Sequence, residues 1–344
     1  MLSLRERIDI LVNAGEKLNA AMDSSDYASV FSMAQSSNQW FTQANIKKSI
    51  EAITLCYTDR AKIEKWLSAY KLPENTKPKI LGLLLAGNIP FVGIHDIISG
   101  FIAGHKMHLK YSDKDSYLMP FFVKLITEQN PNAEMYFSEV ERMYDIDMVI
   151  ATGSNNTARY FDYYFGKMPN IIRKNRVSVA VLKEDTSIDQ LKMLGEDVFS
   201  YFGLGCRNIS KMYLPTGYKI EKIMEAFEDW KEWVLHNKYK NNFDYNYAIY
   251  LLNKVKFFTN GSLITLENES IYSRISCLHF SYYDGIEQIQ TELTSLQDEL
   301  QCIVSNVEFP KLQTVEFGAT QAPELWDYAD GVDTMEFLIS QINE

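Results

Sequence analysis

The chain has 344 residues, of which 46% are hydrophobic and 13% aromatic, enough apolar side chains for one large core or two smaller ones. Its formal net charge of −11 argues against broad nucleic-acid binding, because an acidic surface repels phosphate. The four cysteines, Cys56, Cys206, Cys277 and Cys302, lie far apart and form no CxxC pair, so neither a zinc knuckle nor a disulfide framework is indicated.

The sequence indicates no targeting or membrane-spanning segment. Residues 1–7 mix charges of both signs and contain no long apolar stretch, unlike a signal peptide. The most apolar stretch, residues 80–102, is interrupted by glycine, proline, histidine and aspartate and would make a poor membrane span. We therefore expect a cytoplasmic protein.

Residues 1 to about 72 are predicted to be helical, because apolar side chains such as Leu4, Ile8 and Leu11 recur on one helical face. Residues 72–78 contain two prolines and are predicted to be a connector. From Lys79 onward, short apolar runs alternate with amphipathic helical patterns. The expected strands are 80–86, 106–111, 133–137, 148–151 and 177–182, and the expected helices are 94–102, 118–126 and 155–165.

Beyond Ser187 the pattern is mixed. The expected helices there are 188–199, 220–236 and 286–302, and the expected strands are 255–258 and 263–266. Alternation of strands and helices favours parallel sheets covered by helices. We predict an α/β fold of two joined domains. Residues 1–178 would hold the N-terminal helices and an open parallel cofactor-binding sheet, and residues 179–344 a catalytic cysteine and the C-terminal segment.

Asn88 lies in a loop directly after the first predicted strand, within Gly87-Asn88-Ile89-Pro90. Loops at the carboxyl ends of parallel strands are where α/β sheets bind ligands. The Asn88 amide could donate to an oxyanion, and Pro90 would fix the backbone that aims it. The alternative is an ordinary strand-to-helix turn.

Two more strand ends carry polar residues. Lys110 and Ser112 suit the ribose or phosphate of a nucleotide, although a solvated lysine beside a helix-capping serine is the alternative. Thr152, Gly153 and Ser154 precede a helix whose free N–H groups would attract phosphate, although Gly-Ser after a strand is common. All three loops are expected at one edge of one sheet, which favours the nucleotide interpretation.

The densest basic stretch contains Arg173, Lys174, Arg176 and Lys183, with no acid between Asp162 and Glu184. It would serve a phosphate-rich ligand such as coenzyme A or NADPH, or else form a solvated charged face. No metal site is predicted, because the two histidines at 105 and 108 have no carboxylate or cysteine cluster beside them.

Cys206 differs from the other three cysteines, which we expect to be small core residues. It lies in the phrase Gly203-Leu204-Gly205-Cys206-Arg207. The glycines would permit close approach of a substrate, and Arg207 would favour the thiolate. A thiol near a hydride-carrying cofactor is what thioester reduction or aldehyde oxidation requires.

The order of these motifs resembles the aldehyde dehydrogenase superfamily. More narrowly, the chain is similar to the LuxC-type long-chain acyl-CoA reductases. The residues that carry the narrower resemblance are 87–90, 103–112, 177–181, Cys206, 317–323 and 327–334.

The resemblance implies that Cys206 is the nucleophile and that Asn88 and the Cys206 backbone N–H form an oxyanion hole. It also implies that Lys110 and Ser112 hold the adenosine ribose and that Thr152, Gly153 and Ser154 lie at the cofactor, with the last two near its pyrophosphate. The chain departs from the superfamily in two places. Ala158 replaces the second glycine of the helix start, and residues 171–175 replace the run that holds the glutamate of hydrolysing members.

Lack of that glutamate favours reduction, because an acyl-enzyme must survive until hydride arrives. We therefore expect NADPH-dependent reduction of a long-chain fatty acyl-CoA to the aldehyde, with NADPH favoured over NADH and coenzyme A entering as part of the substrate. The alternatives are an aldehyde or acyl-phosphate dehydrogenase, or a non-catalytic nucleotide-binding scaffold. The expected partners are an acyl-CoA or an acyl-enzyme donor, and further copies of the chain in a homo-oligomer.

Overall fold

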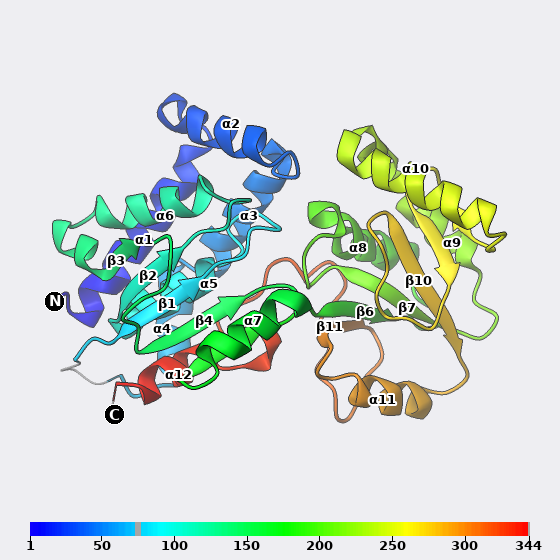
Figure 1. The fold of residues 1–344 in the computed structure, drawn as a ribbon. Helices are drawn as coiled ribbons and strands as arrows, with labels where there is room; N and C mark the ends of the chain where they lie inside the picture. The colour runs from blue at the N-terminus through cyan, green and yellow to red at the C-terminus, as the bar shows by residue number, and fades with distance from the viewer. Residues whose placement is uncertain (73–76, 343–344) are drawn as a thin grey trace. The chain divides into compact units, whose positions relative to one another are not determined.

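The computed structural model describes residues 1–72 and 77–342, so part of the predicted connector, residues 73–76, lies outside the described residues. The chain forms two compact units (Figure 1). The first contains residues 1–175 and 322–344, and the second contains residues 176–321. Within the described residues, no helix has the length and apolar character that crossing a membrane would require.

The first unit is built on a five-stranded parallel sheet with the strand order β3-β2-β1-β4-β5. Its central strands are apolar and buried, as expected for strands covered on both faces. The strands are β1 (Ile80–Leu84), β2 (Lys106–Lys110), β3 (Phe137–Glu139), β4 (Met148–Thr152) and β5 (Asn170–Arg173).

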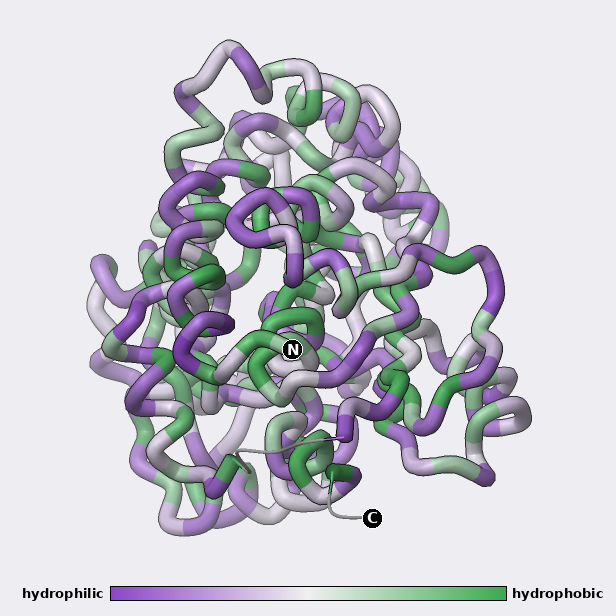
Figure 2. The backbone as a smooth tube through the Cα atoms, turned by 90° about the vertical axis from the view of Figure 1, so that its left-hand side faces the viewer, coloured by the Kyte–Doolittle hydropathy of each residue, from purple (hydrophilic) through white to green (hydrophobic). Residues whose placement is uncertain are grey.

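Helices such as α1 and α3 bury one apolar face, whereas α5 is buried at nine of its ten positions; the alternation of hydrophobic and hydrophilic residues along the chain is visible in Figure 2. The helix α5 ends at Gly104, whose φ of +86° closes the helix in the left-handed conformation. The helices are α1 (Leu4–Ala21), α2 (Ala28–Ser37), α3 (Gln43–Cys56), α4 (Arg60–Leu67), α5 (Ile94–Ala103), α6 (Leu118–Thr127), α7 (Asn155–Phe165) and α12 (Thr334–Ser340).

The second unit contains a six-stranded sheet with the order β11-β6-β7-β10-β9-β8, parallel except for the β8–β9 pair. Its strands are β6 (Val177–Val181), β7 (Ile209–Pro215), β8 (Phe258–Thr259), β9 (Ile264–Glu267), β10 (Cys277–Tyr283) and β11 (Leu300–Ser305). Its α-helices are α8 (Ile188–Phe199), α9 (Ile220–Ala226), α10 (Asn237–Leu252) and α11 (Ile286–Ser295).

The predicted α/β class, with parallel sheets and a helical N-terminus, is confirmed. Four predicted elements are wrong in detail, and one of them is the strand predicted at 255–258, since the strand β8 begins only at Phe258. Residues 131–136 form a 3-10 helix, because Asn130 caps it and Pro131 begins it. The predicted helix 220–236 is α-helical only to Ala226. The predicted helix 286–302 stops at Ser295, and its last residues begin the buried strand β11.

The structure also divides the chain differently from the prediction. The first boundary falls at residues 175–176 instead of 178–179, and residues 322–344 lie in the first unit instead of the second. The physical reason is packing of this segment against the N-terminal helices. Tyr328 accepts a hydrogen bond from Trp66 Nε1 at 2.6 Å, and Tyr70 donates to Asp333 Oδ2 at 2.7 Å. Leu325 and Leu338 are fully buried in the same core.

Candidate active site

The three polar loops of the first unit start from one edge of its sheet. The strands β2, β1 and β4 are neighbours, and Leu84 of β1 is aligned with Lys110 of β2 and Ala151 of β4. Their carboxyl ends therefore lie side by side. This edge carries all of the cofactor and oxyanion candidates of this unit: Asn88, Lys110, Ser112, Thr152, Gly153 and Ser154.

A buried carboxylate that the sequence analysis missed holds two of these loops. Asp115 accepts from the backbone N–H of Phe91 at 3.2 Å and of Leu118 at 3.0 Å. Burial raises the pKa of Asp115 to about 6, and the backbone hydrogen bonds oppose that rise. Gly87 also touches Ser112, since a Cβ at Gly87 would lie 2.8 Å from Ser112 Oγ. An aspartate three residues before an apolar helical run is a capping signal, so Asp115 could have been found from sequence.

The loop after β4 ends in a capped helix. The Ser154 hydroxyl accepts from the backbone N–H of Thr157 at 3.2 Å, which occupies one of the free N–H groups at the start of α7. Gly153 has little room, because a Cβ there would lie 3.0 Å from the ring of Phe161. Ala158, the departure from the superfamily pattern, is the buried residue of this helix. The remaining N–H groups of this helix start can attract an anion.

Internal contacts hold two of the four residues of the basic stretch, Arg173 and Arg176, whereas Lys174 and Lys183 are exposed. Arg173 is buried and donates to both carboxylate oxygens of Asp96. The prediction that Arg173 binds a phosphate-rich ligand is therefore wrong, and so is the alternative that its side chain is solvated. Arg176 donates to the carbonyl oxygens of Gln297 at 3.1 Å and Leu300 at 3.0 Å. This stretch therefore gives little support to a phosphate-rich ligand.

Cys206 lies at the tip of a tight turn in the second unit. The Asn208 N–H donates to Gly205 O at 3.1 Å, and the Gly205 N–H donates to Asn208 Oδ1 at 2.8 Å. Cys206 and Arg207 are therefore the two central residues of a β-turn. Cys206 is exposed, whereas Cys56, Cys277 and Cys302 are buried.

Asn208 anchors this turn to the body of the unit. Its Nδ2 donates to Asp197 O at 3.0 Å and Ser200 O at 2.9 Å, and the residue is buried. The Asp197 carboxylate in turn accepts from the backbone N–H of Gly318 at 2.7 Å and of Thr320 at 3.1 Å. Sequence reasoning missed Asn208, although asparagine in a glycine-rich turn is itself a signal of side-chain-to-backbone bonding.

The chain approaches the turn in a left-handed conformation. Tyr201, Phe202 and Gly203 have φ values of +53°, +59° and +75°. This region costs a non-glycine residue about 1–2 kcal/mol. The Phe202 ring lies 4.5 Å from that of His236 and 5.8 Å from that of Tyr239, and this packing holds the strained segment in place.

A cavity of about 110 Å³ lies beside the turn in the second unit. Gly203, Gly205 and Asn208 form part of its wall, and residues 273–277 form another part. Its lining mixes apolar side chains such as Phe202, Ile209 and Leu263 with polar residues such as Ser210 and Arg274.

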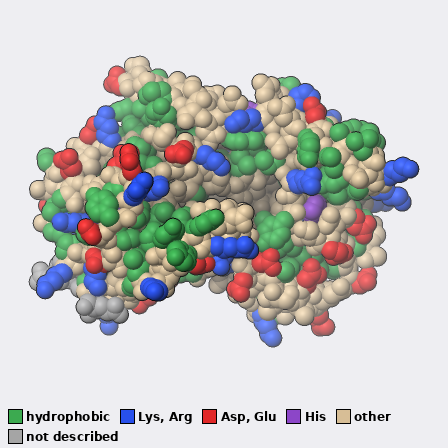
Figure 3. Space-filling model, viewed as in Figure 1, with side chains coloured by type: hydrophobic (Ala, Val, Ile, Leu, Met, Phe, Trp, Pro, Cys, Tyr) green, Lys and Arg blue, Asp and Glu red, His purple; other side chains and the backbone are tan. Residues whose placement is uncertain are grey.

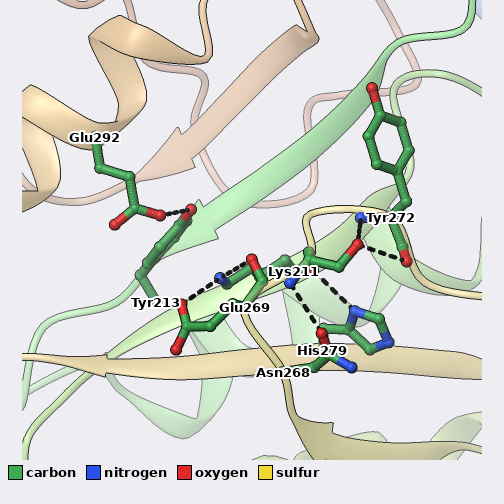
Figure 4. A network of polar contacts seen from close by, with 8 residues as sticks. Lys211, Tyr213, Asn268, Glu269, Tyr272, His279 and Glu292 are labelled. Atoms are coloured by element: carbon green, nitrogen blue, oxygen red, sulfur yellow. Dashed lines mark hydrogen bonds and ion pairs between the residues drawn. The ribbon is translucent and has the colours of Figure 1, made fainter.

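Three side chains of the sheet hold the loop that leads into this wall, and those of Lys211 and His279 are seen in Figure 4. Lys211 Nζ donates to Glu269 O at 2.8 Å, His279 Nδ1 donates to Ser270 O at 2.8 Å, and Ser210 Oγ donates to Ile271 O at 2.6 Å. Lys211 is fully buried, and burial lowers its pKa. Three consecutive carbonyl groups are thus held by β7 and β10.

Comparison with known proteins adds the fold family. No protein-family model and no curated protein matches the chain. Among solved structures, it is similar to aldehyde dehydrogenase 21 from Physcomitrella patens in complex with the product succinate, with a TM-score of 0.70 and 10% identity over 99% of this chain and 85% of that one. The chain has the aldehyde dehydrogenase fold.

Two other structures with the aldehyde dehydrogenase fold are also similar. An indole-3-acetaldehyde dehydrogenase complexed with NAD+ gives a TM-score of 0.64 at 12% identity, over 88% of this chain and 72% of that one. The NADP-dependent glyceraldehyde-3-phosphate dehydrogenase from Bacillus halodurans C-125, complexed with NADP, gives a TM-score of 0.60 at 12% identity, over 89% of this chain and 74% of that one. These likenesses agree with the expected fold class.

Proposed function

We propose that the chain is a nicotinamide-dependent oxidoreductase of the aldehyde dehydrogenase superfamily, and within it an acyl-CoA reductase. The observation that carries the proposal is the exposed Cys206 thiol at the tip of an anchored turn, in a chain with the aldehyde dehydrogenase fold. A thiol in this setting is suited to attack on an acyl carbon.

The first unit has groups that fit a dinucleotide. Lys110 is exposed at the end of β2, Ser112 is half-buried near it, and Ser154 caps the start of the eleven-residue helix α7. An ammonium group, hydroxyl groups and free backbone N–H groups are what ribose and pyrophosphate require. With Arg173 buried, the preference for NADPH over NADH is supported mainly by the resemblance to LuxC-type enzymes.

In the proposed reaction, the Cys206 thiolate attacks the acyl thioester carbonyl, and the bond to coenzyme A breaks. Coenzyme A leaves as a thiolate, which takes up a proton. NADPH, when bound, supplies a hydride to the acyl carbon. The hemithioacetal on Cys206 then collapses, which releases the aldehyde and restores the thiolate. Donors such as Asn88 and the Cys206 N–H would stabilise both oxyanions.

Residues 171–175 support reduction over hydrolysis. They contain no carboxylate, and Arg173 within them is bound to Asp96. A hydrolytic enzyme needs a general base to activate water against the acyl-enzyme. Without one at this stretch, the acyl-enzyme would persist until it is reduced.

The test is to incubate the purified chain with a series of acyl-CoA chain lengths and NADPH or NADH, and to follow cofactor oxidation. Intact mass and peptide mapping would locate the acyl group. We expect oxidation with the native chain, none with Cys206→Ala, and near-native turnover with Cys277→Ala as a matched control. Absence of turnover in the native chain, or unchanged turnover in Cys206→Ala, would overturn the proposal.

A second candidate is a dehydrogenase of free aldehydes or acyl phosphates that uses the same nucleophile. The similar solved structures favour it, because those described above are aldehyde or glyceraldehyde-3-phosphate dehydrogenases. Aldehyde-dependent reduction of NAD+ without coenzyme A would select this candidate. Nucleotide binding without any acylation of Cys206 would instead indicate the non-catalytic scaffold.

We also propose that the chain forms a homo-oligomer through α7. Tyr160, Tyr163 and Tyr164 are 67%, 81% and 68% exposed and lie on one stripe of the helix, within the hydrophobic surface visible over α7 in Figure 3. The same stripe on a second copy would supply a matching surface for a two-fold contact. Light scattering should show the oligomer for the native chain and the monomer for Tyr163→Glu.

A further inference from the structure

The backbone groups of two cysteines in the second unit form hydrogen bonds with the same hydroxyl group. Ser178 Oγ donates to the carbonyl oxygen of Cys206 at 2.9 Å and accepts from the backbone N–H of Cys302 at 3.0 Å. Two backbone groups that bond to one oxygen lie within about 6 Å of each other. The strand order places β6, which carries Ser178, next to both β11 and β7, so the two cysteines approach the same residue from opposite sides.

The Cys302 thiol also has a cation beside it. Arg207, the neighbour of Cys206 in the turn, has Nη1 3.2 Å from Cys302 Sγ. Burial raises the pKa of Cys302, and Arg207 and Ser178 act in the opposite direction. The sequence interpretation of Cys302 as an ordinary core cysteine did not include this contact.

We propose that Cys302 is the resolving thiol for Cys206, so that oxidation of the exposed nucleophile by a peroxide ends in a Cys206–Cys302 disulfide. The inference goes beyond the proposed function, since it concerns peroxide chemistry and requires no acyl substrate. An exposed thiolate is open to oxidation as far as the irreversible sulfinic acid, and a second thiol beside it diverts the reaction to a reversible product.

The chemistry balances in two steps. The Cys206 thiolate attacks one peroxide oxygen, the O–O bond breaks, and the hydroxide that leaves takes up a proton to become water. The Cys302 thiolate then attacks the sulfenic sulfur, the S–O bond breaks, and a second water leaves. The two thiols lose two hydrogens and two electrons in total, and the peroxide is reduced to water.

Formation of the disulfide requires the turn that carries Cys206 to move toward β11. A disulfide requires Cα atoms about 4.4–6.8 Å apart. Cys206 lies at the tip of a turn that follows Gly203 and Gly205, whereas Cys302 lies inside the strand β11. We therefore expect the turn to close on the strand, with the guanidinium of Arg207 moving aside.

Cys277 is the competing partner, because it lines the cavity whose wall includes Gly205. It differs from Cys302 in its surroundings. Burial raises the pKa of both thiols, so the difference is geometric: Arg207 of the turn itself contacts Cys302 Sγ at 3.2 Å, whereas the cation that acts on Cys277 is Arg274, outside the turn. Cys56 lies in the first unit and is buried there. Cys277→Ala is thus the matched control for Cys302→Ala.

The experiment treats the full chain with hydrogen peroxide and maps non-reduced peptides by mass. For the native chain and Cys277→Ala, we expect loss of two hydrogens, a cross-linked pair of peptides containing Cys206 and Cys302, and full reversal by dithiothreitol. For Cys302→Ala, we expect two or three added oxygens on Cys206 that dithiothreitol does not remove. Cys302→Ser serves as a second variant, and circular dichroism checks the folding of each.

Three results would overturn the inference. One is a native chain in which Cys206 gains oxygens without a cross-link. Another is a cross-link from Cys206 to Cys277 or Cys56. The third is equal reversibility in folded Cys302→Ala and in the native chain. None of these bears on acyl-CoA turnover, so the proposed function stands or falls separately.

Discussion

Arg173 and Asp96 form a two-armed ion pair inside the first unit, with Nη1 2.6 Å from Oδ2 and Nη2 2.8 Å from Oδ1. The two side chains are only 8% and 5% exposed. Arg173 also donates to Thr334 Oγ1 at 3.0 Å, so one guanidinium joins β5, α5 and α12. The contact ties the last helix of the chain to the sheet.

Replacement of Arg173 by Met should lower the free energy of unfolding by about 3–5 kcal/mol, because Asp96 would remain buried without its partner. Urea unfolding of the native chain and the variant measures this. The control is Lys174→Met, which removes an exposed pair with Asp162 at 3.9 Å and should cost less than about 1 kcal/mol. Equal losses in the two variants would contradict the structural role of Arg173.

Asp115 should make the stability of the first unit depend on pH. Its pKa is raised from 3.8 to about 6, so the folded state binds more protons than the unfolded state between these values. Stability from this group therefore falls as pH rises from about 4 to 6, by up to about 3 kcal/mol. Urea midpoints from pH 4 to 7 should show this slope in the native chain and a shallower one in Asp115→Asn. Identical slopes would contradict it.

Asn208→Ala should disable the cysteine turn without affecting the first unit. The variant loses the bonds to Gly205, Asp197 and Ser200, of which the two on Nδ2 are buried. We expect a loss of roughly 1–3 kcal/mol in stability and at least a tenfold fall in acyl-CoA turnover. NADPH affinity, measured by fluorescence titration, should stay within a factor of two or so. A parallel loss of NADPH affinity would show that the effect is not local.

Lys211→Met should loosen the loop of residues 268–276, because the Glu269 carbonyl loses its donor while the apolar part of the side chain is kept. Hydrogen exchange with mass detection should show faster exchange in that loop. Lys222→Met is the control, since Lys222 lies 5.5 Å above the Tyr218 ring and holds no carbonyl there. Unchanged exchange in Lys211→Met would contradict the fastening role.

Asn88→Ala should lower kcat of the proposed reaction by roughly 100- to 1000-fold, the usual effect of removing one oxyanion donor. The KM for acyl-CoA should change much less, since the interaction would form mainly in the transition state. Steady-state kinetics separate the two constants. Asn156→Ala, at an exposed position in the first turn of α7, should leave both unchanged.

The sequence predicted well what depends on local pattern. Alternating apolar runs located β1, β2, β4 and β6, and polar residues just after them marked the edge where Asn88, Lys110 and Ser154 start their loops. The prediction failed where contacts between residues far apart in the chain determine the secondary structure. The apolar residues of β11 fit a helix as well as a strand until the neighbouring β6 is known, because short apolar runs are ambiguous.

Several site residues could not be found from pattern for the same reason. Arg173 lies in a basic stretch of the kind that binds phosphate. Only its contact with Asp96, which is far away in the chain, shows that it belongs to a core ion pair. Ser178 and Cys302 occupy ordinary strand positions, and their relation to Cys206 arises from the sheet order. The placement of residues 322–344 likewise follows from tertiary packing.

The return of residues 322–344 to the first unit makes the second unit an insertion in the chain. During synthesis, every strand of the inserted unit is available before the helix α12 has left the ribosome. The first unit begins to be translated first, but it is therefore complete only after the second unit has been synthesised. A premature stop codon just before Thr334 would remove α12 from the first unit and leave the second unit complete.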